Sequence, residues 1–108
     1  MIDLPSFVAD YVETANARDA HGLAACFVPD GTVQDEGRQH RGREAIAAWA
    51  ADTAARYATV IEPRSSAGAD GACTLRAEVR GNFPGSPLVL AFHFALHADG
   101  IQSLEITP

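Results

Sequence analysis

Asp35 is the residue whose surroundings in the sequence best suit acid/base chemistry. It ends a short run, TVQD at residues 32–35, which follows an Asp-Gly turn signal and is typical of a strand. Alternation with a period of two puts Asp35 on the same side as Val33, which we expect to be the inner side. A carboxylate in an apolar interior loses hydration, so it must be paired or must hold its proton more tightly. A general base uses an environment of this kind.

A structural role is the alternative interpretation of Asp35. Its carboxylate could cap the turn at the end of the strand, or pair with Arg38 or Arg41 in the polar segment that follows. The alternation with Val33 favours a carboxylate that faces a cavity. His40 lies in the same polar segment, where it is either solvated or a second acid/base group.

Tyr11 is the second candidate, because its hydroxyl could donate a hydrogen bond to a ligand. It lies on an apolar stripe with helical spacing, which predicts a first helix over about residues 4–17. By itself, a tyrosine on such a stripe is a core aromatic whose hydroxyl finds a partner. The stripe consists of Leu4, Phe7, Val8, Tyr11, Val12 and Ala15.

Two more helices are expected to flank the strand that carries Asp35. Asp19 can cap a second, shorter helix that ends before Gly31. After the strand, the chain turns back at Gly37 through a polar loop over residues 36–41, and a longer helix then begins at Gly42. The inward-facing residues are Leu23, Cys26 and Phe27 in the second helix and Ile46, Trp49 and Thr53 in the third, which reaches about Arg56.

From Tyr57 onward, glycine and proline divide the chain into four strands. Residues 73–79 alternate apolar with polar side chains, as a strand with one buried face does. Residues 88–96 carry large apolar side chains on one face. The other face is small and intermittently polar, and we expect it to form a homodimer contact; it consists of Val89, Ala91, His93, Ala95 and His97. No third ligand joins these histidines at the spacing of a metal site.

This order of elements predicts a single α+β domain over residues 1–108. Its cone-shaped, curved antiparallel sheet should wrap around three helices. A curled sheet closed by helices leaves a hollow, and ligand sites favour concave, mostly apolar cavities with a few polar groups. Tyr11 and Asp35 would supply those polar groups, and the expected apolar wall consists of Val8, Phe27, Val33, Trp49, Phe92, Phe94 and Leu104.

Composition narrows the classes of function. The net charge of -6 argues against a nucleic-acid partner, because phosphates favour basic surfaces. No apolar run approaches the roughly 18 residues that span a bilayer, so we expect no membrane segment. Cys26 and Cys73 occupy apolar positions and are expected to be buried, reduced thiols in a cytoplasmic protein. We expect neither a cofactor nor a metal ion.

The run FVPDGTVQD at residues 27–35, with the element order and length, resembles the nuclear transport factor 2-like superfamily. That superfamily includes SnoaL-like polyketide cyclases and ketosteroid isomerases. The spacing is closest to the isomerases between Tyr11 and Asp35, and it matches at Tyr11, Val12, Asn16, Asp19, Gly22, Phe27, Asp30, Thr32, Val33 and Asp35. The resemblance implies that Asp35 is the catalytic base and that Tyr11 donates a hydrogen bond to the substrate oxygen.

The chain departs from the isomerases at the second hydrogen-bond donor. That family has a protonated aspartate before a His-Phe pair, whereas Phe92 precedes His93-Phe94 here. Phe27 and Ala50 occupy the positions of its supporting tyrosines. The resemblance therefore implies an isomerase acting on a small hydrophobic carbonyl compound with one donor fewer. A polyketide cyclase and a binding module without turnover are the alternatives.

Overall fold

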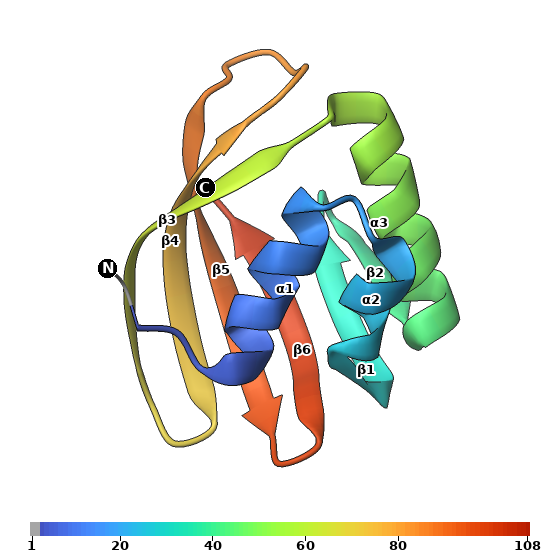
Figure 1. Cartoon of the computed structure of the whole chain (residues 1–108), viewed down its shortest axis with the longest axis vertical. Coiled ribbons are helices and arrows are strands. Elements are labelled where there is room, and N and C mark those ends of the chain that lie inside the picture. The colour runs from blue at the N-terminus through green and yellow to red at the C-terminus, as the bar shows by residue number, and fades with distance from the viewer. Residues whose placement is uncertain (1–2) are drawn as a thin grey trace.

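The computed structural model describes residues 3–108, which form three helices and one six-stranded sheet (Figure 1). The helices are α1 (Ser6–Asn16), α2 (Ala20–Ala25) and α3 (Arg43–Tyr57). The strands are β1 (Phe27–Asp35), β2 (Arg38–Arg41), β3 (Val60–Ala69), β4 (Ala72–Arg80), β5 (Leu88–His97) and β6 (Gly100–Thr107). Among these residues, no helix is both long enough and apolar enough to cross a membrane.

The strand order in the sheet is β2-β1-β6-β5-β4-β3. Strands β3 to β6 form the predicted antiparallel meander, and β1 pairs antiparallel with β2. The pairing of β1 with β6 is parallel, so the sheet is mixed rather than wholly antiparallel. The reason is topological: α3 carries the chain away from the β1-β2 hairpin to the far edge, and the meander returns to place β6 beside β1.

The three helices lie against one face of the sheet (Figure 1). Helix α1 contacts β3 and β6, and α3 contacts β1 and β2. The predicted alternation in β4 is confirmed, because Cys73, Leu75, Ala77 and Val79 are all buried. Both cysteines are buried and unpaired. The largest fully buried side chains are Tyr11, Phe27, Ile46, Leu75, Ile101, Leu104, Val8 and Val33.

Two predicted boundaries differ from the structure. Phe27 opens β1 instead of ending the second helix, because its segment begins to pair with β6: the Ile101 N–H donates to the Cys26 carbonyl at 2.8 Å. Gly100 permits this approach, since a Cβ there would lie 2.8 Å from the Cys26 oxygen. The segment expected to be a polar loop contains β2, which is mostly exposed and pairs with β1 through backbone groups.

Asn16 joins the end of α1 to the start of the meander. Its side-chain amide donates to the Ile61 carbonyl at 2.9 Å, and its side-chain oxygen accepts from the Ile61 N–H at 2.8 Å. One side chain thereby provides hydrogen-bond partners for both the backbone N–H and the carbonyl of Ile61 on the edge strand β3. The helix that carries Tyr11 is consequently held at a defined position over the sheet.

Candidate active site

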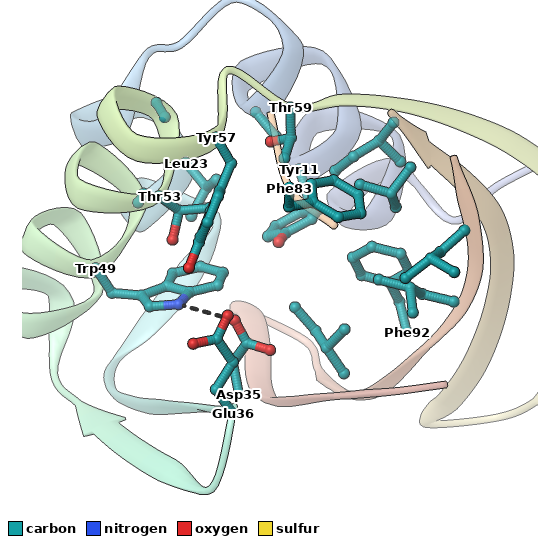
Figure 2. A pocket seen from close by; sticks show the side chains of 18 of the residues that line it. Tyr11, Leu23, Asp35, Glu36, Trp49, Thr53, Tyr57, Thr59, Phe83 and Phe92 are labelled. Carbon is teal, nitrogen blue, oxygen red and sulfur yellow. Dashed lines mark hydrogen bonds between the residues drawn. The ribbon is translucent and has the colours of Figure 1, made fainter. Parts of the chain in front are cut away.

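A cavity of about 640 Å³ lies between the helices and the inner face of the sheet (Figure 2). Its size falls within the range of about 300–1,000 Å³ that is usual for small-molecule sites. The polar or aromatic side chains that line it are Tyr11, Thr14, Arg18, Asp19, Asp35, Glu36, Trp49, Thr53, Tyr57, Thr59, Phe83, Phe92 and Thr107. Most of the remaining lining is aliphatic. The cavity is thus an apolar chamber with a few polar groups.

Asp35 ends β1 with its half-buried carboxylate in this cavity. Burial raises the pKa of the Asp35 carboxyl above its usual value, and the hydrogen bond from Trp49 opposes this rise. The charge of Glu36 raises the same pKa further, whereas His40 lowers it. The alternation with the fully buried Val33 therefore aims Asp35 inward, as the sequence predicts.

Of the two alternative roles for Asp35, the ion pair finds no support in the geometry, whereas a hydrogen bond from the Glu36 backbone is in keeping with a carboxylate that caps the turn. Arg38 is its backbone partner across the β1-β2 hairpin, but Arg38 and Arg41 are both exposed. Within residues 3–108, no basic side chain forms an ion pair with Asp35. Its side chain instead accepts a hydrogen bond at Oδ2 from Trp49 Nε1 at 3.3 Å (Figure 2).

Tyr11 reaches the cavity from α1 and is 2% exposed. The rings of Phe27, Phe92 and Phe94 surround it, with centroids 6.3, 6.3 and 5.4 Å away. No group in residues 3–108 forms a hydrogen bond with its hydroxyl, which keeps accessible surface in the cavity. Burial raises the pKa of Tyr11 far above its usual value, so the hydroxyl stays protonated. It can donate a hydrogen bond to a ligand.

Trp49 connects the base to the helical layer. It lies on the predicted stripe of α3, and its indole N–H reaches Asp35 on the neighbouring strand. The His40 ring packs against the indole with centroids 6.0 Å apart and a tilt of 34°. His40 itself does not line the cavity. The hydrogen bond from Trp49 therefore orients the carboxylate.

Glu36 and Tyr57 also line the cavity, and neither was a sequence candidate. Glu36 lay in the segment expected to be a polar loop, but its backbone φ of 53° turns its carboxylate inward (Figure 2). Tyr57 is the last residue of α3 and directs its hydroxyl into the cavity (Figure 2). The Phe83 ring packs edge-on against the Tyr57 ring, with 6.1 Å between the ring centroids. The Glu-Gly pair that follows Asp35, typical of a turn with positive φ, was the available signal for Glu36.

The predicted apolar wall divides into two groups. Trp49 and Phe92 line the cavity. The other five predicted residues do not line it, because their side chains fill the core between helices and sheet; they are Val8, Phe27, Val33, Phe94 and Leu104, each 0–2% exposed. Sequence periodicity identifies the inner face but does not separate the cavity wall from the packed core.

Residues 3–108 contain no group of three or more His, Cys, Asp or Glu side chains placed to hold an ion. The predicted surface histidines have local partners: His93 contacts the hydroxyls of Thr74 and Thr107 at 3.4 and 3.0 Å, and His97 lies 3.7 Å from Asp99.

Solved structures of nuclear transport factor 2-like and cystatin-fold proteins share this fold. The SnoaL-like domain model matches residues 8–102, and the chain belongs to that family. A candidate polyketide cyclase from Sinorhizobium meliloti is 36% identical, with a TM-score of 0.93 over 97% of this chain and 96% of that one. Among curated proteins, none matches significantly.

More distant structures share the fold. A protein of ketosteroid isomerase-like fold from Catenulispora acidiphila, crystallised with trimethylamine, is 23% identical, with a TM-score of 0.87 over 98% of this chain and 87% of that one. The epoxide hydrolase/cyclase-like enzyme SalBIII, from salinomycin pyran-ring formation, is 17% identical, with a TM-score of 0.82 over 94% and 87%. At these identities the similarity concerns the fold alone.

Proposed function

We propose that the protein is an enzyme that removes a proton next to the carbonyl group of a small hydrophobic ligand. Asp35 acts as the base, and Tyr11 donates a hydrogen bond to the carbonyl oxygen. One observation carries the proposal: a single cavity holds the half-buried carboxylate of Asp35 and the hydroxyl of the buried Tyr11, which forms no hydrogen bond with any group of residues 3–108. Trp49 and Phe92 contribute to the apolar wall of the substrate site.

The reaction requires only these two groups. Asp35 takes the proton from the α-carbon, and the C–H electron pair moves into the carbonyl to form an enolate. Tyr11 stabilises the oxyanion by donating a hydrogen bond that strengthens as negative charge develops. In isomerisation, the protonated Asp35 returns its proton to the γ-carbon, so the double bond moves and the base is regenerated.

A cyclase is the second candidate, and the 36% identical candidate polyketide cyclase favours it. The first step would be the same. The enolate carbon would then attack a second carbonyl of the same molecule and form a carbon–carbon bond, while the attacked carbonyl oxygen takes up the proton held by Asp35 and regenerates the base. A binding module without turnover is the remaining alternative, and the apolar Phe92 at the position of the second donor favours it.

Isomerisation of a β,γ-unsaturated ketone, such as a Δ5-3-ketosteroid, tests the proposal. We expect slow turnover by the wild type, because losing one oxyanion donor typically lowers the rate about 10²–10³-fold. Asp35→Asn should abolish turnover while leaving ligand binding nearly unchanged. Phe92→Asp should raise turnover if its apolar surroundings keep the new carboxyl protonated. If the wild type and Phe92→Asp both bind the ligand but neither catalyses an Asp35-dependent isomerisation, the isomerase proposal fails. The binding module and the cyclase would then be the remaining functions.

We also propose a homodimer formed through the outer face of the sheet. Val89 is 53% exposed on that face, and His93 and His97 are exposed beside it. Ala91 contributes less to this face than the sequence indicates, because it is only 2% exposed.

We propose a cytoplasmic location, where the free thiols of Cys26 and Cys73 would remain reduced.

A further inference from the structure

We propose that the mouth of the cavity is a subsite for a positively charged amine. It is formed by the carboxylates of Asp35 and Glu36 and the rings of Trp49 and Tyr57. The ligand class is an apolar molecule with an ammonium group at one end. This inference rests on the proposed function only in placing a ligand in this cavity, because it concerns the charge of the ligand rather than its reaction.

The cavity carries an excess of negative charge. Within residues 3–108, the carboxylates of Asp19, Asp35 and Glu36 line it, against one guanidinium, that of Arg18. Asp19 follows Arg18 directly in the chain. No basic side chain of residues 3–108 forms an ion pair with Asp35 or Glu36. A cationic ligand would compensate both charges.

The turn after β1 places the second carboxylate in the cavity. On a regular strand, Glu36 would point away from the side of Asp35. Its φ of 53° departs from that regular strand conformation, and both carboxylates point into the cavity (Figure 2). Glu36 is the more exposed of the two, so it lies at the mouth.

The aromatic rings beside these carboxylates suit an ammonium ion. The face of an aromatic ring attracts a cation, most strongly in tryptophan. His40 packs against the Trp49 indole from outside the cavity lining, which leaves the indole bordering the cavity. Arg56 Cζ lies 5.2 Å from the centroid of the Tyr57 ring, so one face of that ring is already occupied by a cation and Trp49 is the main ring for the ligand. Together, the carboxylates and the aromatic rings form a site for an ammonium ion that carries apolar substituents.

The Tyr11 hydroxyl, which forms no hydrogen bond within the described part of the chain, gives the ligand a direction. It is 2% exposed, whereas Glu36 is exposed, so the two groups mark the inner and outer ends of the cavity. A carbonyl at Tyr11 and an ammonium at Glu36 would place the intervening carbons beside Asp35.

Two probes of the same shape isolate the effect of charge. Phenyltrimethylammonium and tert-butylbenzene differ only in whether a positive nitrogen or a neutral carbon carries the three methyl groups. Trp49 is the single tryptophan of the chain and lines the cavity, so its fluorescence reports binding at this site. We expect the cation to bind wild-type protein about tenfold more tightly than the neutral probe, from the usual strength of cation–π contacts.

Variants of Glu36 test the origin of this preference. Glu36→Gln should reduce it several-fold, and Glu36→Lys should reverse it. Glu44→Gln removes a carboxylate from the exposed first turn of α3, outside the cavity, and should leave the preference unchanged. Equal or tighter binding of the neutral probe, binding of neither probe, or a preference that survives in Glu36→Lys would overturn the subsite. Asp35-dependent isomerisation without cation preference would refute the subsite alone, whereas cation preference without turnover would refute only the enzymatic function.

Discussion

Trp49 Nε1 donates a hydrogen bond to Asp35 Oδ2 over 3.3 Å, so a helical residue holds the carboxylate that ends β1. The contact joins the two layers of the fold at the cavity. It also opposes the effect of burial on the pKa of Asp35, because it stabilises the ionised form. Trp49 on α3 therefore contributes to the direction of the proposed base and limits the rise of its pKa that burial causes.

Replacing Trp49 by phenylalanine should separate these two effects. The variant keeps an aromatic ring but loses the N–H donor, so the pKa of Asp35 should rise further. Turnover at neutral pH should fall about three- to tenfold, because a less well oriented base abstracts the proton more slowly. Carboxyl NMR titration and initial rates measure the two quantities. If neither quantity changes, Trp49 does not position Asp35.

The pH dependence of kcat/KM should show one ascending limb. The rate should rise as Asp35 loses its proton, with an inflection above the usual aspartate value, since burial raises its pKa. Tyr11 should add no descending limb up to about pH 10, where an ordinary tyrosine ionises. His40→Gln should move the inflection slightly upward, because His40 lowers the pKa of Asp35. An inflection at the value of free aspartate would contradict the cavity environment.

Asp35→Asn should stabilise the fold at neutral pH. The folded-state pKa of Asp35 is raised, so its favourable contribution is complete below the unfolded pKa and is lost as pH rises through the folded pKa. The amide avoids that loss, so Tm at pH 7 should be higher for the variant than for the wild type. The difference should shrink toward pH 3. Thermal unfolding at both pH values checks this, and a lower Tm at pH 7 would contradict it.

Asn16→Ala should destabilise the fold by about 1–3 kcal/mol, because it leaves the backbone N–H and carbonyl of Ile61 without their partners. Urea unfolding measures the difference. Asn82→Ala is the matched control, since the exposed Asn82 side chain forms no hydrogen bond within residues 3–108. Equal stability of the two variants would show that the Asn16 contact contributes little.

Val89→Arg should convert the proposed dimer to monomers, because it introduces a guanidinium on the exposed apolar position of the outer sheet face. The new arginine can pair with Glu78, which lies opposite position 89 on β4, so the monomer should stay folded. Light scattering at micromolar concentrations distinguishes the states. Ala48→Arg on the exposed surface of α3 should remain dimeric. A monomeric wild type would refute the dimer.

Local periodicity was sufficient for much of the fold. The stripe of α1 placed Tyr11 inward, and the alternation in β1 placed Asp35 on the side of the buried Val33. Both predictions succeed because 3.6-residue and two-residue periods decide which face of an element is apolar. The third helix and the four-strand meander follow from the same signals and their glycine and proline boundaries.

The contents of the cavity depended on tertiary structure. Glu36 enters through a turn with positive φ, and Tyr57 enters because α3 ends there beside the Phe83 ring. Phe94 has the same inward direction in the sequence as Phe92, yet only Phe92 borders the open space. An alternating pattern specifies an inner face, but helices packed at particular distances decide where that face meets other side chains and where it meets a cavity.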